Sequence, residues 1–296
     1  MNSKWYRCDY RLSDIAAQRL FAPESHSGRA FRKLVARLCD EQRLSLPPAL
    51  FNYDEGRPIA SLPAVRFLGY ARGLSLIGLG DEGVKLAEGA APVVHAALTK
   101  AANAIISVEQ RSGAVLLRPT PMPVRYVAKS ALLSPTAAVP KWLQWVDMAK
   151  EQGCTLAEVP QARDEMAALL EASLQRQMDW LDPVAAGSLR SQWNMLATQD
   201  DEDLMVARGD RPFTVRVISC GKHFLQRRQN HTALALQRSN PELAVKGSLP
   251  LVGVKQIEFT VNAELLGIWQ VGRLTSAGNG LVQQVRASAA HGGLLP

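Results

Sequence analysis

The chain has 296 residues, of which 47% are apolar and 21% charged, and its sequence pI is about 9.4. This composition excludes a fully disordered protein, and the length predicts about two domains. No stretch approaches the roughly 18 uninterrupted apolar residues of a membrane helix, and polar residues stand at the start of the chain where a signal peptide needs an apolar core. We therefore expect a cytoplasmic protein that does not bind membranes.

The net charge of +7 is distributed unevenly along the chain. Residues 1–150 carry 20 basic and 12 acidic residues, a net charge of +8, whereas residues 151–203 carry 3 and 11, a net charge of −8. Residues 204–246 carry 8 and 2, a net charge of +6. Because like-signed blocks concentrate an oppositely charged partner at one surface, a nucleic acid is the first partner to consider. The alternative is that the blocks are solvated faces without a ligand.

The four cysteines, Cys8, Cys39, Cys154 and Cys220, match neither a zinc pattern nor a CxxC redox pair. We predict that they are reduced and mostly buried. The histidines, cysteines and aspartates form no cluster with the spacing of metal ligands. The sequence therefore predicts neither a metal ion nor another cofactor.

The first half of the chain alternates between strand and helix patterns. Residues 4–12 alternate apolar and charged side chains, as a half-buried strand does, and an apolar helical stripe with a cationic opposite face follows from Ser27 to Cys39. A hairpin or one bent strand is predicted over 65–78, a second helix after Pro92, and further strands over 105–115 and 124–133. This order predicts a ferredoxin-like βαββαβ unit.

The second half begins with a predicted linker over 134–140, where two prolines stand among small residues. After the linker, apolar residues recur with the spacing of a helix in some segments and alternate as in a strand in others. Helices are predicted over 141–152, 161–181, 189–197 and, apolar nearly all round, 263–275; strands are predicted over 213–219, 254–261 and 281–285.

We therefore expect an α+β protein built from two ferredoxin-like (RRM-like) βαββαβ units, with a helical insert in the second. The predicted parts are an N-terminal domain over 1–135, an acidic helical insert over 136–203 and a C-terminal ferredoxin-like part over 204–290. An acidic insert repels RNA, so we expect it to contact protein or to brace the fold, with its tryptophans engaged in packing.

The stretch from Leu265 to Val282 contains Gly267, Gly272, Gly278 and Gly280 among apolar and small residues. It resembles the carboxy-terminal glycine-rich signature of the RAMP superfamily of CRISPR-associated RNA-binding proteins. Its layout is most similar to the repeat-RNA endoribonuclease branch, which includes the guide-RNA processing protein of type IV systems. An aromatic residue usual in that signature is absent here, because Asn279 and Leu281 stand at these positions.

The resemblance implies an endoribonuclease that binds the repeat hairpin of a precursor CRISPR RNA and cuts it by 2′-OH attack. It also implies that the protein keeps its product and joins other subunits of a CRISPR effector complex. A non-catalytic RNA scaffold of the same superfamily and a DNA-binding regulator are the alternatives, although no convincing helix-turn-helix supports the regulator.

Several residues are predicted to contact RNA. Gly278 and Gly280 can adopt positive φ and expose backbone N–H groups to a phosphate. A tight turn without a ligand also explains the glycines alone, but the basic blocks and the order of elements favour the phosphate contact. Basic residues of the first helix, of the second basic block and of the strands beyond it are predicted to neutralise RNA phosphates. They are Arg32, Lys33, Arg37, Arg216, Lys222, Arg227, Arg228, Arg238, Lys246, Lys255 and Arg273.

RNA cleavage without a metal needs a base for the 2′-OH, a cation for the charge on the phosphate and an acid for the leaving oxygen. Histidine serves as base or acid near neutral pH. In the resembling endoribonucleases a histidine around the first helix acts as the base, which implies His26 with Arg29 beside it. His231, in the second basic block, is the other candidate, while His95 is predicted to be packed. The type IV members imply the alternative that arginines such as Arg29 or Arg228 do this work.

Overall fold

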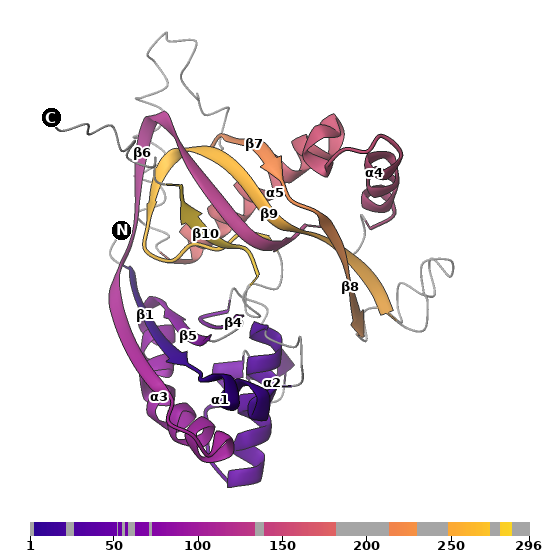
Figure 1. The fold of residues 1–296 in the computed structure, drawn as a ribbon. Helices are drawn as coiled ribbons and strands as arrows, with labels where there is room; N and C mark the ends of the chain where they lie inside the picture. Colours follow the sequence, from indigo (N-terminus) through magenta and orange to yellow (C-terminus); the bar gives the residue numbers. More distant parts are fainter. Residues whose placement is uncertain are drawn as a thin grey trace, which may run out of the picture.

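The computed structural model describes residues 3–21, 27–51, 53–54, 57–58, 63–70, 73–133, 139–181, 213–229, 248–272 and 279–285. Within these ranges, helices lie at both ends of one long antiparallel sheet, and strand β6 runs through the whole molecule (Figure 1). None of the described helices combines the length and the apolarity that a bilayer span requires.

The first unit is a βαββαβ arrangement. Its elements are β1 (Ser3–Arg11), α1 (Asp14–Leu20), α2 (Gly28–Gln42), the 3-10 turn η1 (Pro48–Phe51), β2 (Tyr53–Asp54), β3 (Arg57–Pro58), β4 (Val65–Tyr70), β5 (Gly73–Leu79), α3 (Gly80–Ala102) and β6 (Ser107–Leu132). The sheet order is β4-β5-β1-β6, with antiparallel neighbours. This is the order of a ferredoxin-like sheet, so the predicted topology of this unit is confirmed.

The second unit begins with the same strand β6. Its further elements are α4 (Val139–Glu151), the 3-10 turn η3 (Leu156–Glu158), α5 (Pro160–Leu181), β7 (Val215–Cys220), β8 (His223–Gln229), β9 (Ser248–Leu266) and β10 (Leu281–Gln284). The sheet order is β10-β6-β9-β7, and β8 pairs with β9. The order repeats that of the first unit, so the two ferredoxin-like units share one strand.

Side-chain periodicity explains the first elements. In β1, Tyr6, Cys8 and Tyr10 are buried beneath the helices, so the odd-numbered residues between them point to the opposite side of the sheet. In α2 the apolar stripe packs against β4, and the helix starts where the Ser27 hydroxyl accepts a hydrogen bond from the Ala30 amide over 3.1 Å.

The two units also share a core. Leu68, Ile77 and Leu79 lie on the side of the first sheet that faces away from α1–α3, and they join the apolar cluster of the second unit. Trp142 and Trp145 of α4 belong to that cluster, with 0% and 6% of their surface exposed. Helices α4 and α5, which both contribute residues to this cluster, therefore brace the fold, and the packing predicted for the two tryptophans is confirmed.

The helix predicted over 263–275 is wrong. Residues 263–266 continue β9, where Leu266 pairs with Leu116 of β6, and no helix is formed by the described residues 267–272. Gly267 has φ +88°, and a Cβ there would lie 2.8 Å from the Ala114 carbonyl oxygen. Leu265, Ile268, Trp269 and Val271 are all buried in the core, and an apolar run of this kind has no period that separates strand from helix.

Two other boundaries differ from those predicted. The strands predicted over 105–115 and 124–133 are one strand, β6, which continues through Pro119 with a register shift before Val124. Helix α3 begins at Gly80 and contains Pro92, rather than starting after it. The predicted helix 189–197, the centre of the predicted linker and the predicted boundary at 203 lie outside the described residues.

The cysteines behave as predicted. All four are free thiols, and three of them, Cys8, Cys39 and Cys220, are buried. Burial raises the pKa of the Cys8 thiol, since the thiolate is poorly solvated there.

Candidate nucleic-acid interface

The side of the first sheet that faces away from α1–α3 carries ordered rows of side chains, which are buried against the second unit at β4 and β5 and reach solvent at β1 and β6. Residues paired directly across neighbouring strands share a face of the sheet. Strand pairing therefore aligns one row across β4, β5, β1 and β6, namely Leu68, Ser75, Asp9 and Glu109. The next row consists of Arg66, Ile77, Arg7 and Arg111. Charged residues that are far apart in the sequence thus meet on one surface.

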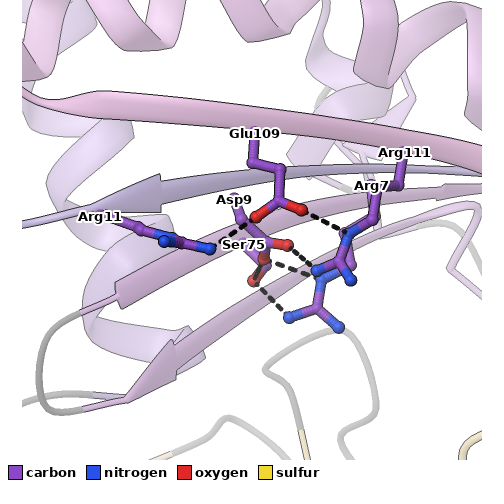
Figure 2. A network of polar contacts seen from close by, with 6 residues as sticks. All are labelled: Arg7, Asp9, Arg11, Ser75, Glu109 and Arg111. Carbon is purple, nitrogen blue, oxygen red and sulfur yellow. Dashed lines mark hydrogen bonds and ion pairs between the residues drawn. The ribbon is translucent and has the colours of Figure 1, made fainter.

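Asp9 is at the centre of this polar cluster (Figure 2). Its Oδ1 accepts hydrogen bonds from Arg7 Nε over 2.8 Å and from the Ser75 hydroxyl. Its Oδ2 accepts from Arg111 Nη2 over 2.5 Å, and Arg7 Nη2 also donates to Ser75 Oγ over 3.2 Å. One buried carboxylate therefore holds two guanidinium groups in fixed positions.

Glu109 extends the polar cluster towards solvent. Its Oε2 accepts from Arg11 Nη2 over 2.7 Å, and its Oε1 lies 3.6 Å from Arg111 Nε. The side chains of Arg11 and Arg111 are 70% and 50% exposed, compared with 5% for Asp9. The cluster therefore presents guanidinium groups outward and keeps their anchoring carboxylate inside, which suits contact with a phosphate.

The electrostatics of Asp9 agree with this geometry. Burial raises the pKa of its carboxyl, but the hydrogen bonds from Ser75, Arg111 and Arg7 outweigh burial and leave the pKa below its ordinary value. Asp9 is consequently ionised at neutral pH and acts as an anchor for the arginines, not as a proton donor.

Helix α2 presents the cationic face that the sequence predicts. Arg29, Lys33 and Arg37 are exposed, and Arg37 pairs with Glu41 at 3.7 Å on the same helix. Arg32 is half-buried and donates to the Phe51 carbonyl of η1, so part of its donor capacity serves the fold. Arg29, the second residue of the helix, is the predicted catalytic residue that lies within the described ranges.

The second unit brings two of the predicted RNA-binding lysines together. Lys222 lies between β7 and β8, and its carbonyl accepts a hydrogen bond from the Lys255 amide of β9 over 3.1 Å. Both side chains are exposed, as is that of Arg216 on β7. Arg125 on the same sheet is paired with Glu258 at 2.5 Å.

The glycine-rich stretch forms a close contact between chain segments. Gly280 has φ +72°, the positive value that the sequence predicts, and a Cβ there would overlap the Val271 carbonyl oxygen. The Gly280 amide donates to the Lys129 carbonyl over 2.9 Å, and its carbonyl accepts from the Val271 amide over 2.9 Å. This amide is therefore engaged by β6, and a contribution of Gly280 to RNA binding stays a prediction.

Other predicted site residues lie outside the described residues. They are His26, His231, Arg238, Lys246, Arg273 and Gly278, together with the side chains of Arg227 and Arg228, whose backbone belongs to β8. His95 is half-buried in α3, its Nε2 lies 2.8 Å from the Ile106 carbonyl, and its ring stacks on Tyr10. The packed role predicted for His95 is confirmed.

Sequence reasoning missed the polar cluster of Asp9. The alternation of charges in β1 was visible, but it indicated only a strand with one polar face. The partners Ser75, Glu109 and Arg111 come from β5 and β6, and only the strand register places them opposite β1. Within the described ranges, no three histidine, cysteine or acidic residues lie close enough together to hold a metal ion.

Two ferredoxin-like units that share one strand, with exposed arginines and lysines on both, place the chain in the class of double ferredoxin-like proteins. The model of a protein family described as "Type IV CRISPR-associated endonuclease Csf5" matches residues 17–187. The chain belongs to this family. The matched residues precede the glycine-rich stretch, so the resemblance read from that stretch is confirmed independently.

Solved structures agree with the fold. The structure described as "Csf5, CRISPR-Cas type IV Cas6 crRNA endonuclease" has a TM-score of 0.58 and 15% identity over 96% of this chain and 100% of that chain. The structure described as "Crystal structure of Cas6b" has a TM-score of 0.53 and 13% identity over 96% and 100%. No curated protein sequence matches the chain significantly.

Proposed function

We propose that the protein is a metal-independent endoribonuclease that binds the repeat hairpin of a precursor CRISPR RNA. It cleaves the hairpin by 2′-OH attack and stays with the mature guide RNA in an effector complex. Membership of an endonuclease family supports the chemistry, and the exposed arginines and lysines of both units support an RNA substrate.

The observation that carries this proposal is the pair of guanidinium groups anchored by Asp9. When the 2′-oxygen attacks the phosphate, negative charge builds up on the non-bridging oxygens, and a preorganised cation stabilises it without reorganisation. Arg7 and Arg111 are held by Asp9 at 2.8 and 2.5 Å, and Arg111 is half exposed. Arg111 is therefore the group that we assign to the phosphate.

The base, the acid and a second cation are assigned to residues that include the start of helix α2. His26 precedes the cap residue Ser27 of α2, and α2 packs against β4 at the edge of the same sheet. We assign the base to His26 and the acid to His231, with Arg29, which lies on the other face of the sheet from Arg111, contacting a neighbouring phosphate of the RNA. Helix N-termini attract phosphate, which favours substrate binding at this end of α2.

The experiment uses the repeat RNA and a copy with one 2′-deoxy nucleotide at the mapped cleavage position, each incubated with the protein in excess EDTA. We expect the all-ribose RNA to be cut to a product ending in a 2′,3′-cyclic phosphate and the deoxy copy to be bound but left intact. Cleavage of the deoxy copy, or a requirement for added metal, would contradict the mechanism. Tight binding of the ribose RNA without cleavage would instead identify a scaffold.

A further inference from the structure

Ser130 has an unusual backbone conformation within a strand. Among the described residues, three non-glycine residues have positive φ: Arg43 and Asn103, which end helices, and Ser130 of β6 with φ +52°. A left-handed conformation is ordinary at the end of a helix but strained in a strand. Strain of this kind persists where the surrounding structure enforces it, and it gathers at functional sites.

The left-handed conformation of Ser130 shifts the alternation of β6, so that the core-facing residues are even-numbered before it and odd-numbered after it. Tyr126 and Ala128 are buried before Ser130, and Ala131 and Leu133 are buried after it. Two successive residues, Lys129 and Ser130, are consequently exposed. A strand with regular alternation exposes one residue at a time.

The neighbouring strand has the same irregularity at the same level. Lys255 and Gln256 of β9 are both exposed, although Val254 and Ile257 on either side are buried. Gln256 pairs directly with Lys129 of β6. The two irregularities are thus adjacent.

Lys222 completes the line across the sheet. Its carbonyl accepts from the Lys255 amide over 3.1 Å, and the Gln256 carbonyl accepts from the preceding Gly221 amide over 2.8 Å. Strands lie about 4.8 Å apart, so the backbones of Lys129, Lys255 and Lys222 fall within roughly 10 Å of one another. We call Lys129, Ser130, Lys222 and Lys255 the lysine line.

The charge of the lysine line is not neutralised within the described part of the protein. The ion pairs there include none of its three lysines, and the nearby Glu258 is engaged by Arg125 and by the Ser219 hydroxyl. The polar cluster of Asp9 differs, because its three arginines face two carboxylates. Three adjacent unneutralised ammonium groups repel one another, and an anion among them removes that repulsion.

The lysine line is also joined to the glycine-rich stretch. The Gly280 amide donates to the Lys129 carbonyl over 2.9 Å, and Leu281 of β10 pairs with Lys129. The backbone that positions the first lysine therefore lies against the stretch that resembles an RNA-binding signature.

We propose that the lysine line is a phosphate-binding site, with the Ser130 hydroxyl as an additional hydrogen-bond donor. This rests on the proposed function, because the phosphate belongs to the repeat RNA. The same chemistry accepts an internal phosphodiester or the terminal phosphate left by cleavage. The site grips the RNA and does not take part in cleavage.

The test compares two variants that each lose three positive charges. The test variant is Lys129→Gln/Lys222→Gln/Lys255→Gln, and the control is Lys85→Gln/Lys100→Gln/Lys150→Gln, from exposed helix positions elsewhere. The dissociation constant of the repeat RNA is measured between about 50 and 200 mM salt, where each phosphate contact contributes about 0.7–0.9 to the logarithmic salt slope. We expect the test variant alone to lose about two units of slope and more than tenfold in affinity at the lower salt.

Cleavage of saturating RNA is measured with the same variants. A wild-type protein that neither binds nor cuts repeat RNA refutes the proposed function. A wild-type protein that does both, with a test variant that binds like the control, refutes the phosphate site alone. Loss of affinity for cleaved RNA with a terminal phosphate, but not for the uncleaved RNA, assigns the site to the terminal phosphate.

A single substitution keeps the proposal open to refutation if the triple variant fails to fold. Ser130→Gly removes the hydroxyl and also relieves the strain, because glycine accepts positive φ. We expect this variant to melt at a higher temperature than the wild type and to bind RNA several-fold more weakly. Unchanged RNA affinity would refute the role of the hydroxyl.

Discussion

The guanidinium of Arg66 donates a hydrogen bond to Oε1 of Gln270 over 2.5 Å, although the two residues are 0% and 2% exposed. Arg66 also contacts Oε1 of Gln177 on α5 over 3.3 Å. Burial lowers the pKa of Arg66 to about 9, and none of the ion pairs among the described residues involves it. A cation held by two neutral amides thus joins the first sheet to α5 and to the glycine-rich stretch.

The first prediction concerns this junction. Arg66→Met leaves buried amide oxygens without their donor, and we expect the free energy of unfolding to fall by about 1–3 kcal/mol. Arg66→Met/Gln270→Met removes donor and acceptor together, so we expect it to recover part of the loss. Urea denaturation of the wild type, both single variants and the double variant gives the coupling energy, and strictly additive effects would show that the contact is not formed.

The second prediction concerns Asp9. Asp9→Asn replaces the carboxylate that anchors two arginines, and we expect about 1–3 kcal/mol of stability to be lost at neutral pH, because both arginines are partly exposed. The folded-state pKa lies below its ordinary value, so this contribution is complete above the unfolded pKa of about 3.9 and is lost as the pH falls through the folded pKa.

Stability measured from pH 7 downward checks this. The difference between the wild type and the Asp9→Asn variant is expected to shrink in acid, and a difference that grows as the pH falls would have the wrong sign. Because Asn keeps the size of the side chain, lost packing does not account for the effect.

The third prediction concerns Gly280. A side chain there meets the Val271 carbonyl oxygen and is forced to positive φ, so we expect Gly280→Ala to cost more than the roughly 1–2 kcal/mol of the backbone conformation alone. Gly89→Ala is the matched control, because it lies inside α3 with no atom within 4 Å of the added Cβ. We expect the control to gain about 0.5–1 kcal/mol.

Thermal unfolding separates these two variants. A melting temperature that drops for Gly280→Ala and rises for Gly89→Ala is the expected result. Equal stability of the two alanine variants would mean that the glycine-rich stretch does not approach Val271 as described.

The fourth prediction concerns the phosphate cation. We expect Arg111→Ala to slow cleavage of saturating repeat RNA by about 100-fold, the usual effect of removing one group that stabilises an oxyanion. Arg163→Ala removes the same charge from a half-exposed side chain of α5, a helix that packs against the edge strand β7, and this variant is expected to cut normally. Single-turnover cleavage rates of the two variants are compared, and equal rates would show that Arg111 does not take part in the mechanism.

The sequence predicted the parts of this fold that carry a local period. Alternation in β1 and the apolar stripe of α2 predicted both elements, and the order of elements predicted the topology of the first unit. The helix prediction over 263–275 was wrong because Leu265, Ile268, Trp269 and Val271 are all buried. A run that is buried on every side has no hydrophobic period from which helix or strand can be predicted.

The candidate site was harder to predict than the fold. Arg29, Lys33 and Arg37 share one helix face, so their spacing in the sequence reports their arrangement. Asp9, Ser75 and Arg111 meet only through the register of three strands, and two of these partners are 66 and 102 positions away from Asp9. The spacing of residues along the chain therefore does not predict contacts between side chains of different strands.

The N-terminal part of strand β6 pairs with β1 and completes the first sheet, whereas its C-terminal part pairs with β9 and β10, which come much later in the sequence. During synthesis on the ribosome the first unit can therefore close while an unpaired strand extends from it. Such an edge invites pairing with another nascent chain, but β6 carries Pro119, Pro121 and Pro123 along this stretch. Prolines lack the amide that intermolecular pairing needs, so the segment at which the β6–β9 register shifts in the finished sheet also disfavours pairing of the unfinished one with another chain.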